Sequence, residues 1–154
     1  MVSKQRKVYK VNLVVDTNIV FSALLNPSSP SGEILMDFDQ ELKFFAPKLM
    51  LEEISKYLPK IERYTKLPSQ KLIQIQNLIF SIVEIVSEEE IKSENWVRAF
   101  EILDEVDQDD IPFLALAYEL DCLLWTGDKK LIKAGKPHIP KTIIDTQHLK
   151  KLLQ

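Results

Sequence analysis

The stretch VNLVVDTNIVFSALL, Val11–Leu25, joins a predicted strand to a predicted helix and places a carboxylate at the junction. Residues 8–15 form a short apolar run rich in β-branched side chains, which is typical of a buried strand. The apolar pattern resumes at once and predicts a helix over residues 17–25. Asp16 therefore stands at the carboxyl end of a strand, in a segment that otherwise has the composition of a core.

The rest of the chain continues this alternation of strands and helices. Four more strands are predicted, over residues 42–46, 81–86, 122–126 and 142–145. Helices are predicted over residues 31–38, 47–58, 69–80, 94–104, 110–120 and 146–153. The alternation predicts an α/β fold with a mainly parallel sheet and helices on both faces. Ligands bind such sheets beyond the carboxyl ends of the strands, which is where Asp16 lies.

Serine and proline residues mark the expected ends of several helices. Ser31 is expected to cap the helix over residues 31–38, and Ser69 is expected to cap the helix that follows it. Pro47 suits the first turn of a helix, which Pro59 is expected to interrupt.

The overall composition is that of an ordinary globular protein. The chain has 154 residues, 45% hydrophobic and 28% charged, and the length predicts a single domain over residues 1–154. Its one cysteine, Cys122, cannot form an internal disulfide, which favours the reducing cytoplasm. No signal-peptide pattern is expected, and no apolar run reaches the roughly 18 residues of a membrane span, so we expect no membrane association.

The charge pattern leaves a local grip on nucleic acid open. The net charge of −3 argues against a protein that coats nucleic acid non-specifically, because such proteins carry a strong basic excess. Basic residues nevertheless cluster at residues 4–10, 56–71 and 129–136. Each cluster is equally well explained as solvated surface or as a contact for an anionic partner.

Several acidic residues share the setting of Asp16. Asp128 follows the fourth strand, and Asp107, Asp109 and Asp110 precede the helix over residues 110–120. Alone, each of these residues is most simply explained as a helix cap, a turn or an exposed side chain. Together they predict carboxylates gathered at one end of the sheet, with Glu52 and Glu53 from the helix after the second strand.

Crowded carboxylates predict a hard divalent cation. Without a cation, their mutual repulsion would make some of them take up protons. Oxygen ligands suit Mg²⁺ or Mn²⁺. Zinc is disfavoured, because His138, His148 and Cys122 have no ligand spacing. Such a site can activate water and stabilise the leaving oxygen of a phosphodiester.

The joint pattern resembles the PIN-domain family, and within it the toxin components of toxin–antitoxin systems related to the VapC-type ribonucleases. The matching segments are VNLVVDTNIVFSALL, APKLMLEEISKYL, DQDDIPFLALAYEL and CLLWTGDKKLI, of which APKLMLEEISKYL is the weakest match. The resemblance implies a three-layer α/β/α sandwich and Mg²⁺- or Mn²⁺-dependent cleavage of RNA. It also implies a cognate antitoxin protein and a homodimer as partners.

The resemblance assigns roles to particular residues. Asp16, Asp110 and Asp128 match the family's metal-binding aspartates, and Glu53 matches its catalytic glutamate, with Glu52 as the alternative because the register is ambiguous by one. The positions that match the family's supporting residues are Thr17, Asn18, Thr126 and Asp107.

Two rival interpretations remain open. One is a PIN-like module that binds RNA or protein without turnover. The other is a phosphatase similar to the haloacid dehalogenases, in which Asp16 would be the nucleophile. This second interpretation is disfavoured, because Asn18 stands where that family's pattern has an aspartate and no further aspartate closely follows Asp128.

Overall fold

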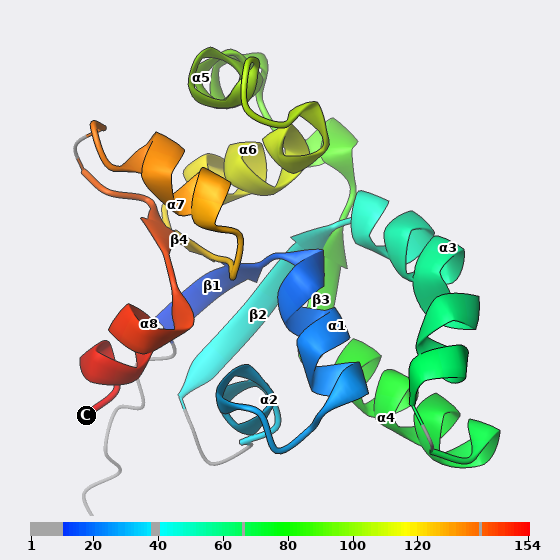
Figure 1. Ribbon diagram of the computed structural model, residues 1–154. Helices are drawn as coiled ribbons and strands as arrows, with labels where there is room; N and C mark the ends of the chain where they lie inside the picture. The colour runs from blue at the N-terminus through cyan, green and yellow to red at the C-terminus, as the bar shows by residue number, and fades with distance from the viewer. Residues whose placement is uncertain (1–10, 38–40, 66, 139) are drawn as a thin grey trace, which may run out of the picture.

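The computed structural model describes residues 11–37, 41–65, 67–138 and 140–154. Within these residues the chain forms one five-stranded sheet in the order β3-β2-β1-β4-β5, and every pairing is parallel (Figure 1). The strands are β1 (Val11–Val15), β2 (Leu42–Pro47), β3 (Val83–Val86), β4 (Leu123–Trp125) and β5 (Ile143–Ile144). The α/β fold class predicted from the sequence is therefore confirmed.

Helices cover both faces of the sheet and form a three-layer sandwich (Figure 1). One layer holds α1 (Thr17–Leu25), α2 (Pro30–Leu35), α3 (Leu49–Tyr64) and α4 (Ser69–Ile82). The other layer holds α5 (Ser93–Leu103), α6 (Ile111–Glu119) and α7 (Lys129–Gly135), and α8 (Thr146–Leu152) packs against α2. Short 3₁₀ turns, η1 (Glu88–Glu90) and η2 (Gln108–Asp110), precede α5 and α6. Of the described helices, none combines the length and the apolar character needed to cross a membrane.

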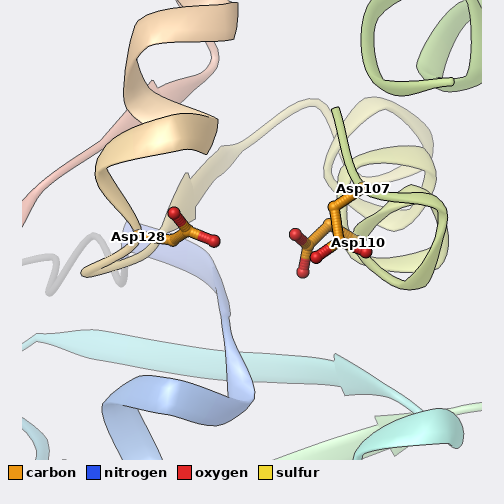
Figure 2. A group of neighbouring side chains, drawn as sticks. All are labelled: Asp107, Asp110 and Asp128. Atoms are coloured by element: carbon orange, nitrogen blue, oxygen red, sulfur yellow. The ribbon is translucent and has the colours of Figure 1, made fainter. Parts of the chain in front are cut away.

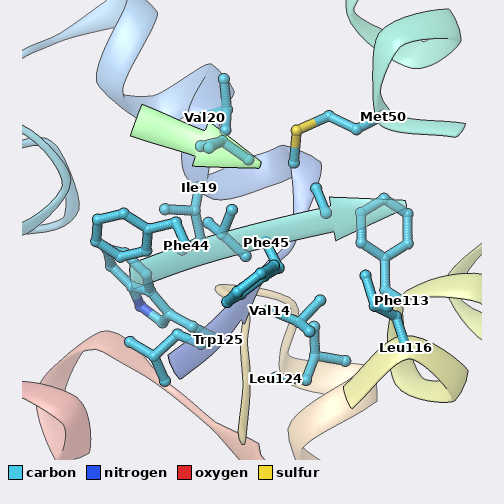
Figure 3. Close-up of a cluster of buried hydrophobic side chains, with 14 of the residues drawn as sticks. Val14, Ile19, Val20, Phe44, Phe45, Met50, Phe113, Leu116, Leu124 and Trp125 are labelled. Atoms are coloured by element: carbon cyan, nitrogen blue, oxygen red, sulfur yellow. The ribbon is translucent and has the colours of Figure 1, made fainter. Parts of the chain in front are cut away.

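The core follows the alternation of side chains along the strands. Val14 is in register with Phe45 on β2 and with Leu124 on β4, so these three side chains share one face of the sheet (Figure 3). On the other face, the rings of Phe44 and Trp125 lie 5.9 Å apart between their centroids. Burying both faces explains why the central strands are apolar runs rather than alternating ones.

The strand order places a switch point between β1 and β4. From β1 the chain moves outward through β2 to β3, and then returns to the opposite side of β1 to form β4 and β5. The backbone N–H of Asp16 donates to the carbonyl oxygen of Trp125 over 2.9 Å, which joins the carboxyl ends of β1 and β4. In open α/β sheets this is the position where ligands bind.

Three expected helix boundaries are wrong. The cap of α2 is Ser29, whose hydroxyl oxygen accepts from the N–H of Gly32 over 3.1 Å, and Ser31 lies inside the helix. Pro47 is the last residue of β2 and not part of the first turn of α3, which begins at Leu49. Ser69 is the first residue of α4 and follows Pro68 at the cap position.

Two predicted helix ends are also wrong, and one helix of the structure was not predicted from the sequence. Helix α3 continues through Pro59 to Tyr64, because Ile61 on its buried face still packs into the core. Helix α7 was not predicted, since its seven residues hold too few apolar positions to show a period. The predicted extension of α2 to Phe38 is wrong, because the helix ends at Leu35. The expected start of the first strand at residue 8 and the basic cluster at residues 4–10 lie outside the described residues.

Candidate active site

Three carboxylates meet at the switch point. One carboxylate oxygen from each of Asp107, Asp110 and Asp128 can be chosen so that all three lie within 4.8 Å of one another. Figure 2 shows these side chains pointing toward a common space, from the η2 segment on one side and from the start of α7 on the other. Segments more than fifteen residues apart in sequence are thus brought together by the parallel sheet.

Asp16 lies buried beside this group, at 5% relative exposure. The hydroxyl of Thr126 donates to its Oδ2 atom over 2.6 Å. Burial raises the pKa of Asp16 to about 6, and repulsion from Asp128 adds to the rise, whereas the hydrogen bond from Thr126 opposes it. Among the described residues, Asp16 does not belong to the group of three oxygens, but its carboxylate lies close enough for its charge to raise the pKa of Asp110.

Asp110 is the most strongly perturbed of the carboxyl groups. Burial is the largest cause, and together with the negative charges of Asp16, Asp107, Asp128 and Glu53 it raises the pKa of Asp110 to about 8. Its Oδ2 atom is inaccessible to solvent and has no hydrogen-bond partner among the described residues. Burying a carboxylate oxygen without a hydrogen-bond partner lowers the stability of the fold, so this atom indicates a site for a bound group that would contact it.

Glu53 and not Glu52 faces the site. The hydroxyl of Thr17 donates to Glu53 Oε1 over 3.0 Å. Burial raises the pKa of Glu53 to about 7, and repulsion from Asp16, Asp109 and Asp107 contributes. Glu52 is exposed to solvent one position earlier on α3. The geometry thus favours the Glu53 register that the sequence left open.

Thr126 and Asn18 connect β4 to the start of α1. The Oγ1 atom of Thr126 accepts from the N–H of Asp128 over 3.0 Å and from Asn18 Nδ2 over 3.4 Å. The Oδ1 atom of Asn18 accepts from the N–H of Gly127 over 3.2 Å. These bonds hold Asp16 and Asp128 in fixed relation across two neighbouring strands.

The capping alternative applies to only some of the aspartates. Asp128 caps α7 by accepting from the N–H of Lys130, and Asp107 caps η2 by accepting from the N–H of Asp109. Asp16 and Asp110 occupy the cap positions of α1 and α6 but make no capping hydrogen bond with their side chains. Capping therefore does not explain why the buried Asp16 and the half-buried Asp110 carry carboxylates.

The donor set suits Mg²⁺ or Mn²⁺. All the donors are carboxylate oxygens, which hard cations prefer, and the described residues bring no histidine or cysteine into the group. Asp107, Asp110 and Asp128 would hold such a cation, since one oxygen of each already lies within 4.8 Å of the others. A divalent cation would also be the partner that Asp110 Oδ2 lacks, because this oxygen could bind it directly.

Sequence reasoning underestimated Asp107. The sequence assigned Asp107 a supporting role, whereas its oxygen lies with those of Asp110 and Asp128. Its spacing of three from Asp110 was visible in the sequence, but the 3₁₀ turn that directs both side chains to one side was not. The contact between Thr17 and Glu53 and the bond from Gly127 to Asn18 likewise depend on tertiary structure.

Comparison with known proteins matches residues 14–153 to the family model of the PIN domain. An uncharacterized protein of Methanocaldococcus jannaschii, MJ1680, is 32% identical over 126 residues, which span 80% of this chain and 74% of that protein.

Solved structures share the fold at low identity. PAE2754 from Pyrobaculum aerophilum aligns with a TM-score of 0.63 and 16% identity over 95% of this chain and 97% of its own. VapBC2 from Rickettsia felis, bound to a DNA fragment from its promoter, aligns with a TM-score of 0.61 and 15% identity over 88% of this chain and 98% of its own. DNA-bound VapBC from Salmonella typhimurium gives a TM-score of 0.60 and 14% identity, with the same coverage of both chains.

The family model agrees with the resemblance found in the sequence. The low identity to the solved structures supports the fold alone, but the family model spans nearly the whole chain. This protein belongs to the PIN-domain family.

Proposed function

We propose that this protein is a metal-dependent endoribonuclease that hydrolyses RNA phosphodiester bonds with Mg²⁺ or Mn²⁺. The observation that carries the proposal is the buried Asp110 oxygen without a partner, set among other carboxylates at the switch point of the sheet. Membership of the PIN-domain family supports a nuclease. The RNA substrate, the cation and the cytoplasmic location are parts of the proposal.

The chain's own residues would divide the work as follows. Asp107, Asp110 and Asp128 would hold the cation, and Asp16 would add negative charge beside it. Glu53, held by Thr17, would orient the attacking water. When bound, the cation would neutralise charge on the phosphodiester and make water a better nucleophile. Attack at phosphorus would break the bond to the 3′ oxygen, leaving a 3′-hydroxyl and a 5′-phosphate.

The test compares cleavage of a panel of RNAs by the wild type and by Asp16→Asn and Asp110→Asn. We expect cleavage that requires Mg²⁺ or Mn²⁺, stops with EDTA, and falls at least about 100-fold in both variants. Asp121→Asn is the matched control, because Asp121 is an exposed aspartate before β4, at the far end of that strand from Thr126. Its positive φ of 49° is a conformation that asparagine also tolerates.

Each outcome separates the candidate functions. Equal activity in wild type and Asp110→Asn would reject the metal-site assignment. An inert wild type that still binds Mg²⁺ would favour the PIN-like binding module. A covalent phosphate trapped on Asp16 would favour the phosphatase.

We also propose that the chain acts as the toxin of a toxin–antitoxin pair. The fold shared with the VapBC structures from Rickettsia felis and Salmonella typhimurium supports this assignment. Induced expression of the wild type should arrest growth of a bacterial host, whereas expression of Asp110→Asn should leave growth unchanged. Arrest that persists in Asp110→Asn would contradict the toxin assignment.

The proposed partners have their own tests. The product of an adjacent reading frame should relieve the arrest and co-purify with this chain. Light scattering should show the proposed homodimer.

A further inference from the structure

Positive charge is concentrated in the last part of the chain. Residues 129–154 contain seven lysines and only one acidic residue, Asp145, although the whole chain has a net charge of −3. The preceding residues therefore carry all of the negative excess. Such asymmetry between parts of one chain is typical of proteins that contact a polyanion.

Two lysines of α7 and the lysine at its C-cap form a stripe that starts at the acidic site. Lys129, Lys133 and Lys136 are spaced i, i+4 and i+7, so they follow one side of the helix at axial steps of about 6 and 4.5 Å. All three side chains are exposed. The helix begins at Asp128, whose carboxylate belongs to the acidic group, so the stripe leads directly away from the candidate catalytic centre.

A cavity of about 410 Å³ lies at the other end of the stripe, between α7, β5 and α8. Its walls include Leu123, Ile132, Ile143 and Leu152, and its lysines are Lys136, Lys141 and Lys151. In Figure 1 this region lies along the edge of the sheet formed by β5, on the opposite side of the molecule from α3 and α4.

The positive charge of this region is largely uncompensated. Among the described residues, no ion pair engages Lys129, Lys133, Lys136 or Lys141. Asp145, the one acidic side chain that lines the cavity, forms a hydrogen bond with His148 over 2.6 Å, and a single carboxylate cannot offset all three lysines of the cavity wall. Uncompensated cations around an apolar cavity favour a ligand that is both anionic and partly apolar.

We propose that this lysine face, Lys129, Lys133, Lys136, Lys141 and Lys151 with the cavity between them, binds the single-stranded RNA that leaves the acidic site. This inference rests on the proposed function. The stripe would contact successive phosphates, and the cavity would accept a base turned out of the strand. A duplex keeps its bases stacked and cannot offer one to an apolar cavity. The continuity of the face with Asp128 favours RNA over an acidic protein segment. The carboxylates at that end of the face would repel an acidic segment, whereas a substrate RNA has to reach them.

The test compares the triple variant Lys133→Gln/Lys136→Gln/Lys151→Gln with a matched triple variant, Lys60→Gln/Arg63→Gln/Lys71→Gln. Both sets lose the same charge from exposed positions, but the second set lies on α3 and α4. Affinity for a labelled single-stranded oligoribonucleotide is measured in EDTA over a range of salt concentrations. We expect the first variant to lose about 10-fold or more in affinity, and its slope of log K against log[salt] to fall by about 2.

Kinetics with Mg²⁺ provide a second measurement. The lysine-face variant should show a raised KM with an unchanged kcat, while the matched variant should resemble the wild type. Leu152→Ala, at an exposed position on the cavity wall, should weaken binding of single strands several-fold without changing the salt slope, because it removes apolar contact and no charge.

Two results would overturn the proposal. One is equal RNA affinity in the two triple variants. The other is competition by polyglutamate or by duplex RNA as effective as that by single-stranded RNA, which would show a general anion surface. The two proposals can fail separately. If the wild type never cleaves RNA but the lysine-face variant loses RNA binding, the lysine face is established and the proposed catalysis is rejected. If the wild type cleaves RNA but the lysine-face variant binds RNA normally, the catalysis is established and the lysine face is rejected.

Discussion

The hydroxyl group of Thr126 serves three neighbours at once. It donates to Asp16 and accepts from the backbone of Asp128 and the side chain of Asn18, at a position with 0% exposure. Thr126→Val keeps the shape of the side chain but leaves buried polar groups without partners. We expect the free energy of unfolding in urea to fall by about 1–3 kcal/mol.

Thr126→Ser is the control for that change, because it keeps the hydroxyl and removes only a methyl group. It should retain most of the stability and the activity. If Thr126→Val were as stable as the wild type, the hydroxyl could not be what holds the two strand ends together.

The raised pKa values of Asp16, Glu53 and Asp110, about 6, 7 and 8, predict how the stability of the metal-free protein depends on pH. Between pH 4 and pH 8 the folded state retains protons that the unfolded chain has already released. Stability therefore decreases as pH rises through this window. Between pH 5.5 and 8.5 in EDTA, we expect a loss on the order of 3 kcal/mol in urea denaturation, discounted for partial solvent exposure of Glu53.

Asp110→Asn should flatten this pH dependence, because it removes the most perturbed group and lowers the repulsion on the others. Asp121→Asn should leave it unchanged. A metal-free wild type that gains stability as the pH rises over the same window would contradict the electrostatic description of the site.

Single residues show where sequence reasoning reached its limit in the site. Asp16, Asp110 and Asp128 were predictable, because each stands at the junction of a strand or loop with a helix. The choice of Glu53 over Glu52 was not predictable from the sequence. Neighbouring side chains on a helix point about 100° apart, and the contact between Thr17 and Glu53 appears only in the folded structure.

At the scale of elements, α3 carries a proline in its interior. Pro59 is exposed and cannot donate to the carbonyl four residues earlier, yet the helix continues to Tyr64. Pro59→Ala restores this hydrogen bond, and we expect it to raise the free energy of unfolding by about 1–2 kcal/mol, after allowance for the freer unfolded chain. Lys60→Ala, at the adjacent exposed position, should change stability by less than about 0.5 kcal/mol. A lower melting temperature in Pro59→Ala would show that the proline is needed.

Helix α7 is held close to the sheet by a glycine. A Cβ atom at Gly135 would lie 3.0 Å from Cδ1 and 3.2 Å from Cβ of Ile143 on β5. Gly135→Ala should therefore displace the helix and lower the free energy of unfolding by about 1–3 kcal/mol. Gly135→Ala/Ile143→Val should recover part of this loss, because the smaller side chain gives up its Cδ1 atom. Equal stability of Gly135→Ala and the wild type would show that the contact relaxes without cost.

Elements were predictable where they are long or strongly apolar. The central strands and α1 follow directly from runs of apolar residues. The end of α3 was not predictable, because the burial of Ile61 outweighs the local effect of Pro59. Helix α7 was missed because a seven-residue helix is decided by its cap at Asp128 and its packing on β5, not by a periodic pattern.

At the scale of the whole molecule, the cation and the fold should stabilise each other. Ligands that bind only the folded state raise its stability by about 2.7 kcal/mol at 100 times the dissociation constant. Mg²⁺ or Mn²⁺ should therefore raise the melting temperature of the wild type, and more strongly at pH 8 than at pH 5.5, where protons compete for the carboxylates.

Asp110→Asn should show little of this stabilisation, and NaCl at equal ionic strength should not reproduce it. If Mg²⁺ raised the melting temperature of wild type and Asp110→Asn equally, the cation would be acting elsewhere on the surface.

The acidic group of Asp107, Asp110 and Asp128 and the lysine face separate negative from positive charge within one molecule, and this separation gives the molecule a dipole moment. In the field of a long polyanion, such a particle is turned before it touches, so that its α7–α8 side leads. A protein whose total charge is repelled by RNA can still approach it in one preferred orientation. The carboxylates of the candidate site would then meet the strand only after the lysine face has captured it.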